Sequence, residues 1–257
     1  MDVIRSLISA FACFSRIPMP RVEWTDDSMK YMMCFFPLVG VAIGLAIAIW
    51  WWLADVVGFG PVARAIGVFA IPAVITGGIH LDGLADVADA QSSHAEPTRK
   101  REILKDPHIG AFALIWVVVY SLVYVGFATE LPGSWAAVVV LGCMHVMSRC
   151  ASGVATVAFP RNAGQGMLAQ FHDSAEKRMT VAVLAITFAL ALAVACIACL
   201  PAGLAIALGT FACLCWLRWF ADSQYGGMSG DLAGFFLQIA ELVMLVASVL
   251  VFKGVGL

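Results

Sequence analysis

The sequence has 257 residues, of which 62% are hydrophobic and 12% are charged, and its mean hydropathy is +0.93. Soluble domains contain roughly 25% charged residues, so this composition excludes an ordinary soluble protein and indicates a membrane protein with several spans. The net charge of −2 provides no positive field for a nucleic acid. The eight cysteines lie in or beside apolar runs, so a disulfide scaffold has no support.

The chain begins with a short apolar stretch, Val3–Phe14, which is interrupted by Arg5. It is too short to cross a bilayer, and we interpret it as an amphipathic segment that lies at the membrane interface or re-enters it.

Seven later stretches are each long and apolar enough to cross the hydrocarbon core, which needs about 20 residues of helix. They are Tyr31–Leu53, Pro61–Ile79, His108–Ala128, Trp135–Phe159, Met179–Leu200, Ala202–Phe220 and Leu232–Phe252. No soluble domain fits between them. The sequence therefore predicts an all-α, polytopic helical bundle that forms a single integral membrane domain over residues 1–257.

The orientation follows from the positions of Lys and Arg, which are enriched in cytoplasmic connections. Most of the 15 basic residues precede the first span, follow the second or fourth, or end the sixth. We therefore expect a cytoplasmic N-terminus and an external C-terminus. The cytoplasmic side then contains three polar segments, near 80–107, 160–178 and 221–231, which we interpret as active-site loops.

The segment after the second span contains Asp82, Asp86 and Asp89, whose spacing places all three on one face of a helix. A solvated helix face is the plain alternative. Because the chain has few charges and glycines surround this cluster, a hard-cation site is the better interpretation.

A second polar segment, Ala221–Asp231, combines Gly226, Gly227 and Gly230 with Asp231 at the start of the last span. Glycines let the backbone approach a ligand and present N–H groups to an anion. The alternative is a flexible loop that ends in an aspartate N-cap.

Other polar residues have two readings each. Lys105 and Asp106 end a basic run that would either hold substrate phosphates or contact anionic lipid, and Asp106 would either react or pair with Arg101. His80 would act as a general base or a phosphate donor, or it is an ordinary interfacial histidine.

Two ionisable residues, Arg149 and Glu241, lie inside predicted spans, where burial of a charge is costly. Each is about 15 Å from the cytoplasmic boundary by helix geometry. We expect them to face each other, either as a structural pair that fixes helix register or as part of the reaction.

Carboxylates beside basic and glycine-rich segments at a membrane boundary suit a substrate that carries a diphosphate. Magnesium bridges carboxylate and phosphate oxygens and neutralises a departing phosphate. The residues alone therefore predict a Mg²⁺-dependent membrane transferase that acts on an activated phosphate ester.

The sequence also resembles the cobalamin synthase family, the adenosylcobinamide-GDP ribazoletransferases, over nearly its whole length. The most specific match is the run His80–Asp86, HLDGLAD, within Thr76–Asp89. Further matching segments are Phe14–Pro20, Phe36–Gly40, Glu102–Asp106, Ile109–Gly110, Ser148–Arg149, Gly164–Gly166 and Gly226–Asp231, with Glu241. One departure is Ala90, where members often have glycine.

This resemblance implies transfer of α-ribazole, or its 5′-phosphate, onto adenosylcobinamide-GDP, with release of GMP. It implies that Asp82, Asp86, Asp89 and Asp231 hold Mg²⁺ and that His80 or Asp106 is the base. Lys105, Arg149 and the Gly226–Gly230 loop would bind the diphosphate, and the N-terminal segment would border the corrinoid. We expect a multi-pass protein of a bacterial cytoplasmic membrane in contact with lipid, with homo-oligomerisation and pathway-enzyme partners left open.

Two other classes of protein fit parts of the pattern. A CDP-alcohol phosphotransferase or an aromatic prenyltransferase also uses clustered aspartates, but each normally has a second paired or repeated acidic motif that is missing or sparse here. A cation-coupled transporter would use Glu241 and Arg149 near the membrane centre. Against transport, most acidic residues lie at the boundary and no inverted repeat is evident.

Overall fold

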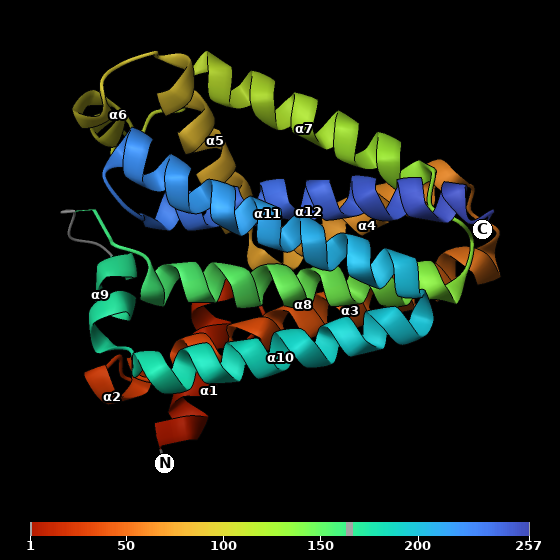
Figure 1. The fold of residues 1–257 in the computed structure, drawn as a ribbon, viewed down its shortest axis with the longest axis horizontal. Coiled ribbons are helices and arrows are strands. Elements are labelled where there is room, and N and C mark those ends of the chain that lie inside the picture. Colours follow the sequence, from red (N-terminus) through yellow and green to blue (C-terminus); the bar gives the residue numbers. More distant parts are fainter. Residues whose placement is uncertain (1, 163–166, 257) are drawn as a thin grey trace.

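The computed structural model describes residues 2–162 and 167–256, and these residues form helices α1 to α12 without an extended β-strand (Figure 1). The helices are α1 (Asp2–Phe14), α2 (Asp26–Met29), α3 (Met32–Val57), α4 (Pro61–Thr76), α5 (Ile79–Ser92), α6 (Pro97–Ile103), α7 (Ala111–Thr129), α8 (Trp135–Ala158), α9 (Met167–Ser174), α10 (Lys177–Ala198), α11 (Leu200–Tyr225) and α12 (Gly230–Gly254). The predicted all-α, multi-pass bundle is confirmed.

Six helices in the described residues are long and apolar enough to cross a membrane, namely α3, α7, α8, α10, α11 and α12. The pair α4 and α5 adds a seventh if it counts as one broken span. Figure 1 shows the long helices running side by side. Helix α1, whose apolar part is Val3–Phe14, is shorter than these spans.

The second predicted span differs from the observed one at its end. It was expected to continue to Ile79, but α4 stops at Thr76 and α5 leaves at an angle of 95°. Gly77 and Gly78 have φ values of +66° and +80°, a backbone conformation that other residues adopt at a cost. The stretch near 80–107, which the sequence predicts to be a loop, contains helices α5 and α6. The stretch near 160–178 contains α9.

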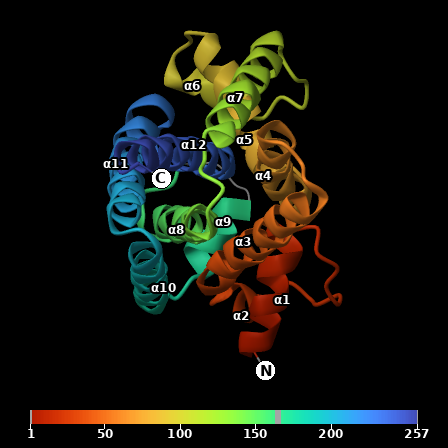
Figure 2. The same ribbon diagram turned by 90° about the vertical axis from the view of Figure 1, so that its right-hand side faces the viewer.

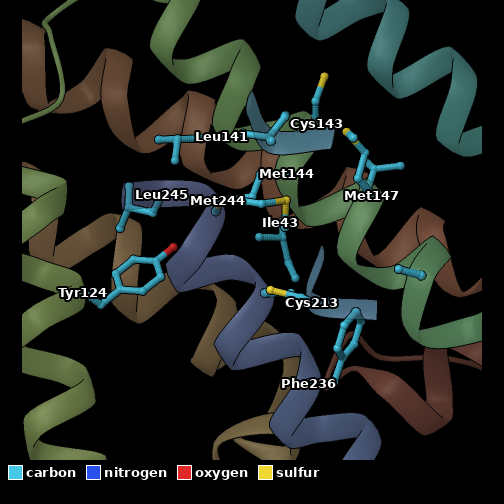
Figure 3. Close-up of a cluster of buried hydrophobic side chains, with 14 of the residues drawn as sticks. Ile43, Tyr124, Leu141, Cys143, Met144, Met147, Cys213, Phe236, Met244 and Leu245 are labelled. Atoms are coloured by element: carbon cyan, nitrogen blue, oxygen red, sulfur yellow. The ribbon is translucent and has the colours of Figure 1, made fainter. Parts of the chain in front are cut away.

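Helix α8 is the centre of the bundle. Of its most apolar 18-residue stretch 83% is buried, against 17% for α10. Figure 2 shows α8 surrounded by α3, α10, α11 and α12. In Figure 3, Leu141 and Met144 of α8 meet Ile43 of α3 and Met244 of α12, and all four side chains are buried.

The outer helices present large apolar side chains to the surroundings. Ile197 of α10 is 86% exposed, and Leu208 and Phe211 of α11 are also exposed. A contiguous apolar exterior of this kind is stable when lipid, and not water, covers it.

The three polar segments singled out in the sequence lie at the same end of the bundle, on the left of Figure 1. Two of them are joined by backbone hydrogen bonds. Met228 N donates to Pro160 O at 2.9 Å, and Asn162 N donates to Met228 O at 3.1 Å. Residues that are far apart in the sequence therefore form one polar end.

Candidate active site

Helix α5 carries the aspartates on the face that is turned away from the core. Asp82 is exposed and Asp86 and Asp89 are half-buried, whereas Leu84 and Val87 are buried. The predicted sharing of one helix face is confirmed, because side chains four and three residues apart project in similar directions.

Asp231 of α12 lies directly against this helix. A β-carbon on Gly83 would be 2.6 Å from the Asp231 carbonyl oxygen, so only glycine allows the two backbones to come this close. Asp86 interacts electrostatically with Asp82, Asp89 and Asp231, and Asp231 interacts with Asp82. The sequence expectation that Asp231 joins the cluster therefore agrees with its position in the fold.

Asp89 makes a contact with the start of α7. Its Oδ1 accepts a hydrogen bond from Ala113 N at 3.3 Å, in the first turn of α7. The carboxylate lies against Gly110, where a β-carbon would overlap it. Asp89 thus satisfies one of the free N–H groups at the start of α7, as an N-cap does.

The four carboxylates repel one another, and none of them makes an ion pair with Lys, Arg or His in the described part of the chain. Among the described residues, no group of three or more His, Cys, Asp or Glu side chains is close enough together to hold a metal ion as the side chains stand. The donor set nevertheless fits a hard divalent cation, because it consists of carboxylate oxygens without competing basic partners.

His80 is buried, with 5% of its surface exposed, and it borders the same cavity as Asp82 and Asp231. Its Nε2 atom has no hydrogen-bond partner in the structure. An unpaired ring nitrogen can accept or donate a proton, and the role of His80 as a base stays a prediction.

Asp106 and Lys105 lie elsewhere, in the exposed segment between α6 and α7. The backbone N–H of His108 donates to Asp106 Oδ1 at 3.0 Å, and this bond together with the His108 ring lowers the pKa of Asp106. A carboxylate with a lowered pKa is a weaker base. The assignment of Asp106 as a base and of Lys105 as a phosphate ligand stays a prediction.

The glycines of the second segment have separate positions. Gly226 ends α11 with φ +67°, beside Arg101. Gly227, with φ +130°, lies against the backbone of Arg161 and Asn162. Gly230 borders the cavity of Asp82 and Asp231. Gly226 and Gly227 therefore shape the turn, and Gly230 is the one placed beside the acidic cluster.

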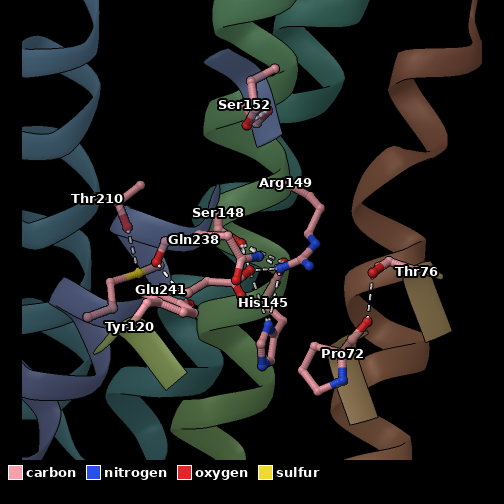
Figure 4. Close-up of polar contacts among 12 residues, drawn as sticks. Pro72, Thr76, Tyr120, His145, Ser148, Arg149, Ser152, Thr210, Gln238 and Glu241 are labelled. Carbon is pink, nitrogen blue, oxygen red and sulfur yellow. Dashed lines mark hydrogen bonds and ion pairs between the residues drawn. The ribbon is translucent and has the colours of Figure 1, made fainter. Parts of the chain in front are cut away.

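Arg149 and Glu241 form an ion pair inside the bundle, as the sequence predicts (Figure 4). Ser148 Oγ donates to Glu241 Oε1 at 2.9 Å, and His145 Nδ1 is 3.2 Å from the same oxygen. Arg149 is fully buried, although its Nε and Nη2 atoms have no partner. Contact of Arg149 with a substrate diphosphate stays a prediction, since its guanidinium points into the core here.

Arg149, Glu241 and His80 all line one cavity of about 10 Å³. A space of this size holds about one water molecule. His80 therefore borders both the buried network and the cavity of Asp82 and Asp231.

Sequence reasoning missed Arg16, which follows α1. Its backbone N donates to Ile75 O at 2.7 Å, and its side chain lies over Gly77, where a β-carbon would overlap it. Together with Gly77, Gly78 and Asp82, Arg16 borders a cleft of about 560 Å³. In the sequence Arg16 contributes to the orientation signal, and its position within the matching segment Phe14–Pro20 is the one sign of a further role. The Gly164–Gly166 segment lies outside the described residues.

The fold and the site define a polytopic helical membrane protein with an acidic, cation-compatible cluster and a neighbouring arginine at one end. The family model described as cobalamin-5-phosphate synthase matches residues 6–249, and the chain belongs to this family.

Curated relatives agree over nearly the whole chain. A protein of Lachnoclostridium phytofermentans named adenosylcobinamide-GDP ribazoletransferase is 36% identical, over 95% of this chain and 92% of its own. Proteins of the same name from Clostridium botulinum and Brucella ovis are each 29% identical, over 97% of this chain and 98% and 96% of their own. No solved structure matches.

Proposed function

We propose that this protein transfers α-ribazole, or its 5′-phosphate, onto adenosylcobinamide-GDP. The ribose hydroxyl of α-ribazole attacks the phosphorus on the cobinamide side of the diphosphate and loses its proton. The bond from that phosphorus to the GMP oxygen breaks, and GMP leaves. Family membership over residues 6–249, with the reaction named in the relatives, supports this proposal.

The observation that carries the site assignment is the close approach of α12 to α5 at Gly83, which brings Asp231 to Asp82 and Asp86. These three carboxylates would hold Mg²⁺, with Asp89 at the edge of the cluster. When bound, Mg²⁺ neutralises the diphosphate and the leaving GMP. The carboxylates orient the reacting phosphate.

His80 takes the proton of the attacking hydroxyl in this proposal. Its unpaired Nε2 and its place in the cavity of Asp82 and Asp231 support it over the exposed Asp106. Arg16, in the cleft that Asp82 also borders, contacts the diphosphate of the donor. A planar guanidinium suits phosphate oxygens because it offers two parallel hydrogen bonds.

The test is GMP release by purified protein in lipid, with Mg²⁺, adenosylcobinamide-GDP and α-ribazole. We expect release to require both substrates, to stop with a chelator, and to fall at least about 100-fold in Asp82→Asn. The matched control is Asp55→Asn, because Asp55 pairs with Arg64 outside this cluster. Folded wild-type protein that releases no GMP would contradict the proposed reaction.

We also place the site on the cytoplasmic face of a bacterial membrane. The distribution of Lys and Arg supports this orientation, since the polar end of the bundle carries most of the basic segments. A nucleotide donor that is made in the cytoplasm reaches the site directly from that side.

A further inference from the structure

A second cavity, separate from the cleft of Arg16, is also bordered by Asp82. Its volume is about 290 Å³, and it lies between α1, α3, α5, α8, α9 and α12. Asp82 and Asp231 are at its polar part, and Phe14, Phe36 and Phe171 are among its lining residues. Asp82 therefore borders both the cleft that contains the Arg16 side chain and a cavity with aromatic walls.

The aromatic side chains form one continuous wall. The ring centroids of Phe14 and Phe36 are 4.3 Å apart, and those of Phe14 and Phe171 are 5.8 Å apart with an edge-to-face arrangement. Aromatic walls of this kind favour a flat ring, which gains stacking and edge contacts along its whole face.

Apart from the carboxylates of Asp82 and Asp231, the cavity offers few free hydrogen-bonding atoms. Ser152 Oγ donates to Ala233 O, and Thr156 Oγ donates to Ser152 O at 2.9 Å, so both hydroxyls are engaged. Among the described lining residues, His80 alone has a buried side-chain atom without a partner. A ligand with one or two polar atoms near His80 fits, whereas a ligand with many donors and acceptors would leave them unpaired.

This chemistry discriminates between the two planar rings of the reaction. Guanine presents the acceptors O6 and N7 as well as N–H donors. The carboxylates of Asp82 and Asp231 can accept from the donors, but among the described lining residues His80 alone has an unpaired buried atom to offer the two acceptors. Dimethylbenzimidazole, the base of α-ribazole, is apolar at its methyl-bearing edge and has one unsubstituted ring nitrogen. The corrinoid is far larger than a cavity of 290 Å³. A lipid chain would place its anionic headgroup against Asp82 and Asp231 and leave His80 unpaired.

We propose that the cavity walled by Phe14, Phe36 and Phe171 binds the base of α-ribazole, with the ribose directed at His80, Asp82 and Asp231. The proposal rests on the proposed function and assigns the two substrates to the two cavities that Asp82 borders. The nucleoside acceptor enters the aromatic cavity, and the diphosphate donor occupies the cleft of Arg16.

The test uses Phe171→Leu, which removes the ring but keeps most of the side-chain volume of this buried residue. We expect the KM for α-ribazole to rise about 10-fold, as for loss of one stacking contact, while the KM for adenosylcobinamide-GDP changes less than about twofold. The matched control is Phe211→Leu, because Phe211 is exposed on α11 and far from the cavity lining.

A second measurement does not need turnover. Isothermal titration of α-ribazole alone into wild-type protein and Phe14→Leu, both in lipid nanodiscs, reports the same subsite, and we expect weaker binding to the variant.

Normal GMP release with an unchanged KM for α-ribazole in both variants would overturn the subsite and leave the proposed function intact. A rise only in the KM of the donor would assign the cavity to guanine. Absence of GMP release from the wild type would instead refute the proposed function.

Discussion

Asp82 and Asp89 lie on the same face of α5, but their carboxylates contact different parts of the protein. Asp82 borders both cavities at the end of the bundle, whereas Asp89 accepts a hydrogen bond from the first turn of α7. Residues with the same identity and spacing therefore differ in their contribution to stability, which the sequence pattern does not distinguish.

The contact of Asp89 predicts a stability effect that depends on hydrogen bonding and not on charge. We expect Asp89→Ala to lower the free energy of unfolding by about 1 kcal/mol, as loss of an N-cap does, and Asp89→Asn to lower it by less. Thermal unfolding in detergent measures both. Equal stability of the two variants and the wild type would show that Asp89 has no capping role.

The buried pair of Arg149 and Glu241 predicts strong coupling. Replacing either residue alone by leucine leaves a buried charge without its partner, and we expect a loss of about 3–5 kcal/mol. The double variant Arg149→Leu with Glu241→Leu should be more stable than either single variant, because no unpaired charge remains. The charge exchange Arg149→Glu with Glu241→Arg tests the same contact. Additive losses in a double-mutant cycle would refute the pairing.

At the level of elements, the turn between α4 and α5 aims the aspartate helix at α12. Gly77 has two constraints there: its φ is +66°, and the Arg16 side chain occupies the place of a β-carbon. Gly78 has φ +80°, but the place of its β-carbon is open. A comparison of alanine substitutions at Gly77 and Gly78 therefore distinguishes the cost of backbone strain from the cost of overlap with Arg16.

We expect Gly77→Ala to be more destabilising than Gly78→Ala, since both variants share a backbone cost of about 1 kcal/mol and only the first displaces Arg16. We also expect the KM for adenosylcobinamide-GDP to rise in Gly77→Ala alone. Thermal unfolding and steady-state kinetics measure the two effects. Identical behaviour of the two variants would remove Arg16 from the donor site.

The sequence predicted those elements whose physical cause is local. Apolar runs such as Trp135–Phe159 predicted spans, because a helix that crosses a bilayer must be apolar over its length. The pairing of Arg149 with Glu241 was predictable as well, because a charge buried inside the membrane is costly without a partner. The 95° turn was missed, because hydropathy does not report φ. The aromatic cavity was missed as well, because Phe14, Phe36 and Phe171 come from α1, α3 and α9 and meet only after folding.

For the whole molecule, the two ends of the bundle differ. Figure 1 shows the C-terminus at the end opposite α6 and α9, as an odd number of crossings requires. The six separate spans give this result only if α4 and α5 together complete one further crossing.

This arrangement predicts an external C-terminus. A C-terminal alkaline phosphatase fusion should be active, because that enzyme folds outside the cytoplasm. A C-terminal fluorescent-protein fusion, expressed in the same strain, should be dark. The reverse pattern, a fluorescent fusion with inactive phosphatase, would place the C-terminus in the cytoplasm and contradict the predicted orientation.

Asp82 and Asp231 are adjacent in space, yet the chain between them contains α6 to α11. During synthesis the acidic face of α5 consequently emerges long before the helix that completes it. A partly inserted chain has the charges of α5 but not the neighbouring carboxylate of Asp231. If these residues form the proposed site, activity arises only when α12 docks, after the preceding helices have been inserted.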